Sequence, residues 1–311
     1  MSNEKLYAPC FDFRNISKFY GSKCVLDDIT ITIPVGANFC FIGKNGSGKT
    51  TALKLCANLL LPDKGKMYFK GRCIGNDGIS MQSRIGAFIN PERSLYWRLT
   101  GWENVERTIF LKDGDYNEKI KQAKDLFLLF DLEKDKKKLV GLYSKGMKAK
   151  LLLINALIGD PDVLLLDEPF EGLDLPTRRK VIDILKILNK RGKTIIMTAH
   201  NLVEMQNFAS DVCWFDQGKV AFMGSPEKLI ATIPGQGVIE IYSQRLELFE
   251  AIVSGMGSKI ISCDKEEDVL RILTHDLTGT FNDLKKDIDS AYERLELHVK
   301  GIEDVYTFYR K

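Results

Sequence analysis

The sequence predicts an α/β fold built on a sheet of parallel strands, followed by a small C-terminal α+β domain. Three short, mainly apolar runs at residues 38–42, 163–166 and 194–198 have the length and composition of buried strands. Helical patterns lie between them, which is the alternation expected when helices connect parallel strands. A glycine-rich loop follows the first run directly and is followed by a helical pattern, so the chain contains a strand–loop–helix unit.

The elements around this unit follow from local patterns. Residues 11–33 predict short strands broken by turns, because apolar side chains alternate with polar ones up to a Pro-Val-Gly turn signal. Residues 51–61 contain good helix formers, and Pro62 is expected to end that helix. Residues 95–157 are predicted to be mainly helical, with the charged run 133–138 as a solvated connection.

A domain boundary is expected near residues 232–237, where proline and glycine lie close together. We therefore predict a first domain over residues 1–232 and a C-terminal accessory domain over residues 238–311. The second domain carries no recognisable chemical motif. Its expected elements are strands at 238–242 and 260–262 and helices at 246–253 and 281–292.

Composition excludes several classes of protein. The 311 residues are 44% hydrophobic and 28% charged, values typical of a folded chain rather than a disordered or collagen-like one. The net charge of +3 is too small to indicate nucleic-acid binding. No apolar run approaches the roughly 20 residues that cross a bilayer, and the N-terminus lacks the apolar core of a signal peptide. The seven cysteines form no Cys-x-x-Cys pair, so we expect reduced thiols in a cytosolic protein.

The glycine-rich loop has the spacing of a phosphate-binding motif. Its residues are Gly43, Lys44, Asn45, Gly46, Ser47, Gly48, Lys49 and Thr50. Glycines let the backbone wrap around an anion, and successive N–H groups and the N-terminus of the next helix attract negative charge. Lys49 is expected to bind the β- and γ-phosphates, and Thr50 to hold Mg²⁺, with Thr51 beside it as a further nucleotide-binding residue. The motif alone does not choose among kinases, GTPases, helicases and transport ATPases.

A second candidate site follows the apolar run 163–166, which leads into Asp167 and Glu168. Ligands of α/β proteins collect at the carboxyl ends of parallel strands, so Asp167 is expected to hold Mg²⁺, directly or through water. Glu168 points the other way along an extended backbone and can polarise an attacking water as a general base.

Taken together, the motifs resemble the ATP-binding subunit of an ABC transporter over about residues 10–230. They occur in that family's order and are the phosphate loop, Tyr143-Ser144-Lys145-Gly146-Met147, Leu166-Asp167-Glu168-Pro169, Gly172-Leu173-Asp174 and His200. The resemblance implies an ATPase with a P-loop NTPase core, an antiparallel β subdomain and a helical subdomain at about residues 93–158. It also implies ATP and Mg²⁺ as cofactors.

The resemblance assigns roles to further residues. Tyr20 resembles the aromatic residue that stacks on adenine; packing against the first sheet is the alternative. His200 resembles the residue that reaches the γ-phosphate and the attacking water. Asp174 resembles the acid of a loop that crosses to a partner subunit, and Pro176 after it indicates a new helix. Ser144, Lys145, Gly146 and Met147 resemble the signature that contacts the γ-phosphate of ATP held by a second subunit, with Lys145 where the family most often has glycine.

One family feature is missing. The loop that normally supplies a glutamine to Mg²⁺ and the attacking water corresponds to residues 85–93, which contain no glutamine. Asn90 and Glu92 are the alternative replacements, depending on where the alignment is anchored. This departure leaves the metal sensor open and is the sole support for a non-hydrolysing regulatory module.

The resemblance implies two copies that close head to tail on ATP and separate after hydrolysis, bound to a membrane permease. Residues 94–99, with Trp102 close behind, are a candidate docking surface for that permease; core packing is the alternative. The ending 302–306 resembles exporter ATPases, so we expect an exporter on the inner face of the cell membrane, with no nucleic-acid partner. The competing interpretation is a soluble relative that acts on nucleic acid or the ribosome.

Overall fold

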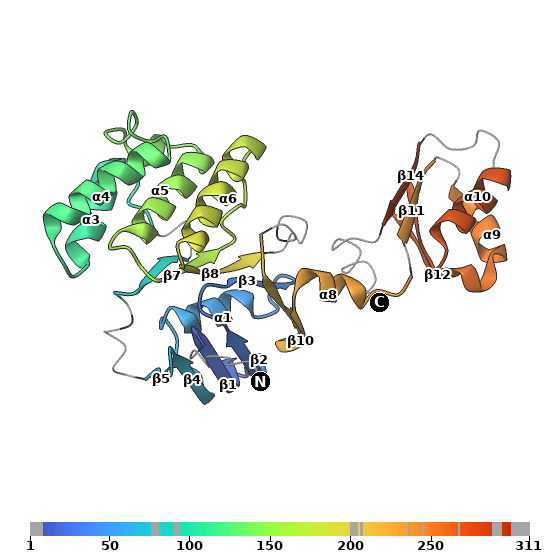
Figure 1. Ribbon diagram of the computed structural model, residues 1–311, viewed down its shortest axis with the longest axis horizontal. Helices are drawn as coiled ribbons and strands as arrows, with labels where there is room; N and C mark the ends of the chain where they lie inside the picture. Colours follow the sequence, from blue (N-terminus) through green and yellow to red (C-terminus); the bar gives the residue numbers. More distant parts are fainter. Residues whose placement is uncertain are drawn as a thin grey trace, which may run out of the picture. The chain divides into compact units, whose positions relative to one another are not determined.

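The computed structural model describes residues 9–75, 81, 83–89, 94–199, 205, 208–235, 237–243, 246–266, 268–287 and 294–299 (Figure 1). The chain divides into two compact units, residues 1–224 and 225–311. Within the described ranges, no helix combines the length and apolarity that crossing a membrane requires. All seven cysteines lie in those ranges as free thiols.

The first unit contains two sheets and the helices that connect their strands. Its elements are β1 (Phe11–Tyr20), β2 (Lys23–Ile33), β3 (Asn38–Gly43), α1 (Lys49–Cys56), β4 (Lys64–Phe69), β5 (Arg72–Cys73), β6 (Ile85–Phe88), α3 (Gly101–Leu111), α4 (Tyr116–Leu129), η2 (Val140–Leu142), α5 (Lys145–Leu157), β7 (Val163–Asp167), α6 (Leu175–Lys190), β8 (Thr194–Ala199), β9 (Asp211–Asp216) and β10 (Lys219–Gly224).

The larger sheet positions the predicted site. Its strand order in the described chain is β10-β9-β3-β8-β7-β6, and every neighbouring pair from β9 to β6 is parallel. β10 differs, because it returns from β9 as an antiparallel edge strand. Because β8 lies between β3 and β7, the carboxyl ends of these three strands meet at one edge of the sheet. The phosphate loop, the acid pair and the end of β8 therefore come together.

The second sheet of this unit is antiparallel, with the order β2-β1-β4-β5. Its strands β1 and β2 are longer than the short strands expected from the sequence. A shared hydrophobic core joins them to α1 and to the larger sheet, and its buried members include Phe11, Phe13, Phe41, Leu53 and Phe215. Burial of large aromatic side chains from both sheets fixes α1, and with it the phosphate loop, against the larger sheet.

Helix α1 ends earlier than the sequence predicts, at Cys56 instead of residue 61. Asn58 adopts a left-handed conformation with φ of 53°. Its N–H donates to the carbonyl of Leu55, and the Leu59 N–H donates to the carbonyl of Lys54. This pair of bonds is a Schellman motif, which terminates a helix without requiring proline. The predicted endpoint is therefore wrong, and Asn58 is the signal for the true one.

Helices α3, α4 and α5 pack against one another, and α5 also contacts β6 (Figure 1). Thr100 and Glu103 form a capping box that starts α3. Charged residues 133–138 lie in turns between α4 and η2, with exposed or half-buried side chains. The mainly helical character predicted for this part of the chain is thus present.

The second unit is a split β-α-β fold. Its elements are α8 (Pro226–Ala231), β11 (Gly237–Tyr242), α9 (Leu246–Gly255), η3 (Gly257–Lys259), β12 (Ile260–Glu266), β13 (Val269–Thr274), α10 (Leu277–Asp287) and β14 (Arg294–Val299). Its sheet has the order β12-β13-β11-β14, and each neighbouring pair is antiparallel. One face packs on α9 and α10 through a core that includes Ile239, Ile241, Phe249, Ile272 and Leu284. β13 and β14 are additions to the elements expected from the sequence.

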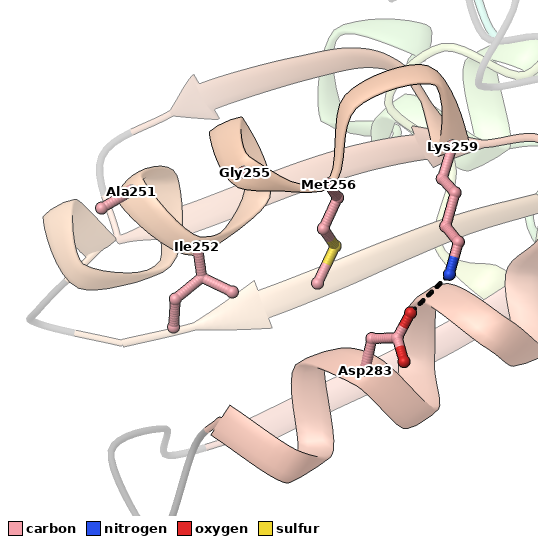
Figure 2. Close-up of a pocket in the computed structure, with 6 residues that line it drawn as sticks. All are labelled: Ala251, Ile252, Gly255, Met256, Lys259 and Asp283. Carbon is pink, nitrogen blue, oxygen red and sulfur yellow. Dashed lines mark hydrogen bonds and ion pairs between the residues drawn. The ribbon is translucent and has the colours of Figure 1, made fainter.

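A hollow of about 500 Å³ lies on this second unit, lined by Ala251, Ile252, Gly255, Met256, Lys259 and Asp283 (Figure 2). The Lys259 ammonium lies 2.6 Å from the Asp283 carboxylate. This bond raises the pKa of Lys259. The hollow therefore combines apolar side chains with one neutralised charge pair.

The face of the β12-β13-β11-β14 sheet that points away from α9 and α10 contains a largely buried ion pair. The Nε of Arg271 donates to the Glu240 carboxylate at 2.6 Å, and the two side chains are 31% and 8% exposed. Arg271→Met is expected to destabilise the second unit by about 2 kcal/mol, because a buried carboxylate loses its arginine while part of the arginine was already solvated. Hydrogen exchange of β11 and β13 amides measures the change.

Arg294→Met is the matched control, because Arg294 pairs with Glu296 in the same sheet but is 66% exposed. The Arg294→Met substitution is expected to lower the free energy of unfolding of the second unit by at most about 0.5 kcal/mol. Equal protection in the two variants would show that the Glu240–Arg271 pair does not stabilise the unit.

Candidate active site

Gly43, Gly46 and Gly48 of the phosphate loop all have positive φ angles, and at Gly43 and Gly48 neighbouring atoms also leave no room for a side chain. Gly43 has φ of 144°, and a Cβ there would lie 2.4 Å from the carbonyl oxygen of Phe215. Gly48 has φ of 113°, and a Cβ there would lie 2.6 Å from Leu26. These are conformations and approaches that a side chain obstructs. In contrast, a Cβ at Gly46 would meet nothing within 4 Å, so this part of the loop faces open space.

Lys49 begins α1 and is only 4% exposed. Its ammonium donates to the carbonyl oxygens of Gly43 at 2.7 Å and Lys44 at 3.0 Å. Burial lowers the pKa of Lys49, while the nearby carboxylates of Glu168 and Asp167 raise it by less. The loop thus holds a desolvated cation beside two acids.

Asp167, at the end of β7, links the strand edge to the phosphate loop. Its Oδ1 accepts hydrogen bonds from the hydroxyl of Thr50 at 3.0 Å and from the hydroxyl of Thr198 at 2.7 Å. The structure therefore brings together the two residues that the sequence analysis assigned to Mg²⁺. The sequence does not single out Thr198 as a site residue, although Thr198 lies in the predicted strand 194–198.

Glu168 directly follows β7 and has an unusual backbone. Its φ is 49°, in the left-handed region that non-glycine residues seldom occupy. Its N–H donates to the hydroxyl of Thr198 at 2.9 Å. The chain therefore turns sharply after Asp167 instead of continuing in the extended form expected from the sequence. The Glu168 carboxylate lies close enough to Lys49 to oppose the lowering of the lysine pKa by burial.

These residues fit a bound Mg²⁺–nucleoside triphosphate. Within the described chain, the buried hydroxyl of Ser47 has no hydrogen-bond partner, which is costly unless a ligand or water supplies one. Lys49 offers a cation to phosphate oxygens, and successive loop N–H groups cradle anions. Thr50 and Asp167 offer the hard oxygen ligands that Mg²⁺ prefers. Of the remaining loop residues, Lys44 and Asn45 are exposed and Thr51 is buried.

The predicted signature forms the start of α5. Ser144 is its N-cap, and the Ser144 hydroxyl accepts from the Met147 N–H at 3.2 Å. Tyr143 before it is buried, and its hydroxyl donates to the carbonyl of Asp135 at 2.8 Å. The first turn of α5 contains no acidic residue. Ser144, Lys145 and Gly146 therefore lie at the positive end of a helix dipole, anchored by Tyr143.

Asp174 lies next to this signature. It caps α6 by accepting from the Thr177 N–H at 2.8 Å, which lowers the pKa of the Asp174 carboxyl. A Cβ built on Gly172 would lie 3.2 Å from Cδ of Lys145, so the Lys145 side chain runs along the Gly172 backbone. Pro176 occupies the first turn of α6, as the sequence predicts.

Of the remaining predicted residues, Tyr20 is described by the structure, and the others lie outside the described ranges. Tyr20 ends β1 with 47% of its surface exposed, so it is not a core residue of the first sheet. His200, Asn90 and Glu92 lie outside the described residues. Among the described residues, no hydrogen bond or ion pair joins the signature to the phosphate loop.

Comparisons with known proteins identify the family of this chain. The ABC transporter family model matches residues 26–171. The chain is 36% identical over 236 residues to Nod factor export ATP-binding protein I of Burkholderia lata, covering 74% of this chain and 76% of the relative. It is 28% identical over 283 residues to the linearmycin resistance ATP-binding protein LnrL of Bacillus subtilis, covering 89% of this chain and 85% of that one.

A solved relative has the same fold. The dimeric structure of a post-hydrolysis state of the ATP-binding cassette MJ0796, bound to ADP and phosphate, matches with a TM-score of 0.63 at 25% identity. The match covers 69% of this chain and 98% of that chain. The predicted P-loop NTPase fold is confirmed. By sequence and by structure, the chain belongs to the ATP-hydrolysing ATP-binding proteins of ABC transporters.

Proposed function

We propose that this ATPase powers an ABC exporter, with two copies of the chain clasping two ATP molecules against a membrane permease. The observation that carries the proposal is the meeting of Lys49, Thr50, Asp167 and Glu168 at one edge of the sheet. This edge provides a phosphate-binding cation, two Mg²⁺ ligands and a general base. The transporter relatives favour this function over action on nucleic acid or the ribosome.

At this edge, each residue is proposed to act on ATP in a distinct way. Bound Mg²⁺ would neutralise charge on the phosphates and is proposed to be held by Thr50 and Asp167, with Asn90 or Glu92 as the further candidate. Lys49 binds the phosphates, the loop N–H groups of residues 43–50 cradle them, and Tyr20 stacks on the adenine. Glu168 accepts a proton from the attacking water, and His200 contacts the γ-phosphate.

The proposed pairing of two copies uses two groups of residues in each chain. The signature at Ser144–Met147 and the adjacent Asp174 form one group, and the phosphate loop forms another. A homodimer with twofold symmetry would set the signature of each copy against the ATP of the other. ATP then stabilises the closed pair, and hydrolysis removes the shared contacts and favours opening.

The permease is proposed to bind the segment 94–99. Asn104, which is 3% exposed, holds the backbone of Tyr96 through two hydrogen bonds of 2.8 and 3.1 Å. Tyr96 and Trp97 are nevertheless 46% and 57% exposed. Large exposed aromatic side chains on an anchored loop are typical of protein interfaces. Trp102 instead is half-buried and packs its ring against the buried Phe127, with centroids 5.8 Å apart.

Trp97→Ala is expected to weaken binding of the permease by about tenfold or more, because central tryptophans contribute most to interfaces of this kind. Affinity purification of the tagged full chain from membranes, with quantification of the captured integral membrane protein, measures the effect. Tyr116→Ala is the control, since Tyr116 is an exposed aromatic residue of α4 outside the proposed segment. Equal capture by the Trp97→Ala and wild-type chains would reject this docking surface.

We propose that the chain works at the inner face of the cell membrane and drives export. The direction of transport can be tested without knowing the substrate. Cells that carry an inactive Glu168→Gln chain are compared with wild-type cells by mass spectrometry of the medium and the cell extract. Export predicts a compound that is lost from the medium and accumulates in the variant cells. A compound that stays in the medium and is depleted from the variant cells would indicate import.

A further inference from the structure

The end of β8 contains a buried hydroxyl group between the two halves of the site. Thr198 is 1% exposed and pairs in register with Asp167 on the parallel neighbour β7. On its other side, β8 pairs with β3, the strand that leads into the phosphate loop. Thr198 therefore occupies the strand position at which the loop and the acid pair converge.

This hydroxyl engages both acidic residues at once. It donates to Oδ1 of Asp167 at 2.7 Å and accepts from the N–H of Glu168 at 2.9 Å. A threonine hydroxyl has one proton to donate, and here that proton is committed to Asp167. One buried atom thereby fixes the side chain of one acid and the backbone of the next.

The backbone that Thr198 holds is a strained one. Glu168 has φ of 49°, and such a conformation at a non-glycine residue persists only when its surroundings hold it in place. The φ and ψ angles of Glu168 set the direction of its side chain, so a relaxed backbone would move the carboxylate. The hydrogen bond to Thr198 ties this turn to β8, which lies between β3 and β7 in the sheet.

Thr198 differs from the other hydroxyl on Asp167. Thr50 also donates to Oδ1 at 3.0 Å, but its proposed role is to hold Mg²⁺. Thr198 lies in the strand rather than in the loop, and its two bonds remain within the protein. Its hydroxyl is thus suited to keep Asp167 oriented while Thr50 serves the metal.

We propose that Thr198 is a positioning residue for ATP hydrolysis, which holds the carboxylate of Asp167 and the backbone of Glu168 in their working geometry through one hydroxyl. This inference rests on the proposed roles of Asp167 and Glu168 in the ATPase site. It predicts a defect in turnover rather than in nucleotide binding, because Lys49 and the loop N–H groups keep their positions.

The test is Thr198→Val in the full chain, because valine keeps the branched shape and removes the hydroxyl. We expect kcat for ATP to fall about tenfold or more, as for loss of one hydrogen bond to a charged group, while KM changes by less than about threefold. Thr198→Ser should recover kcat to within about threefold of wild type. Thr198→Ala should show the same loss as valine, and it answers the question if the valine variant does not fold.

Thr194→Val is the matched control. Thr194 is also 1% exposed and lies on the same strand, but its hydroxyl accepts from the Gly36 N–H at 2.9 Å, at the other end of β8. Loss of this hydroxyl should leave kcat within about twofold of wild type. A Thr198→Val chain with the kcat of Thr194→Val would overturn the inference, and so would failure of Thr198→Ser to recover turnover.

A Glu168→Gln chain, assayed in parallel, separates the inference from the proposed function. If Glu168→Gln hydrolyses ATP at the wild-type rate, the proposed role of Glu168 is wrong, and the inference on Thr198 falls with it. If Glu168→Gln is inactive and Thr198→Val matches its control, only the role of Thr198 is wrong.

Discussion

Glu168→Gln is expected to lower kcat for ATP hydrolysis by about 10²- to 10⁴-fold, because the amide cannot accept a proton from the attacking water. ATP affinity should stay close to the wild-type value, since Lys49 and the phosphate loop are unchanged. Phosphate release under saturating ATP measures turnover, and equilibrium titration with ATP measures binding. The combination distinguishes a lost catalytic group from a damaged binding site.

Glu171→Gln is the control for this prediction. Glu171 is exposed in the same turn, and its N–H donates to the Glu168 carbonyl at 3.1 Å. Its replacement removes an equal charge only three residues along the chain and should leave turnover unchanged. Similar rates in the two variants would mean that Glu168 is not the general base.

Lys49→Ala is expected to weaken ATP binding by about 10- to 100-fold, the effect of losing charge-assisted hydrogen bonds to phosphate. Burial lowers the pKa of Lys49 below its unfolded value, so the charged lysine costs folding free energy in the empty site, and this cost is relieved as pH rises through the folded-state pKa. Bound phosphates would add negative charge beside the ammonium and offset this cost. The rise in unfolding temperature on addition of ATP should therefore be lost together with the affinity.

Lys54→Ala in the last turn of the same helix is the control for Lys49→Ala. It removes one positive charge from α1 away from the loop, and it should keep both the ATP affinity and the ATP-induced rise in unfolding temperature. Wild-type ATP affinity in the Lys49→Ala chain would contradict the assignment of the phosphate loop.

The sequence was most informative where chemistry restricts the choice of residue. Gly43 and Gly48 adopt backbone conformations that favour glycine, so the loop motif is visible in the letters alone. The apolar runs before Gly43 and Asp167 identify β3 and β7, because strands buried on both faces are apolar throughout. A motif at the end of each such strand implies that the two motifs lie side by side at the sheet edge. The hydrogen bond between Thr50 and Asp167 is the contact between them.

Features that depend on tertiary contacts were not visible in the sequence. Thr198 reads as one polar residue in an apolar strand, and its role emerges only from the placement of β8 between β3 and β7. The left-handed turn at Glu168 is not predicted by the sequence, because the position is occupied by glutamate and not by glycine. In the second unit, β13 contains Arg271, which weakens its apolar pattern, and its partner Glu240 is 31 residues away in the chain. Such long-range pairing leaves no local signal.

The central claim is that ATP joins two copies of this chain, and the molecular mass of the Glu168→Gln chain tests it most directly. Light scattering on the full chain should give about 35.2 kDa without nucleotide and about twice that value with ATP and Mg²⁺. Addition of ATP to a Lys49→Ala/Glu168→Gln chain should leave the mass unchanged. A Glu168→Gln chain that binds ATP and remains a monomer at every protein concentration would contradict the claim.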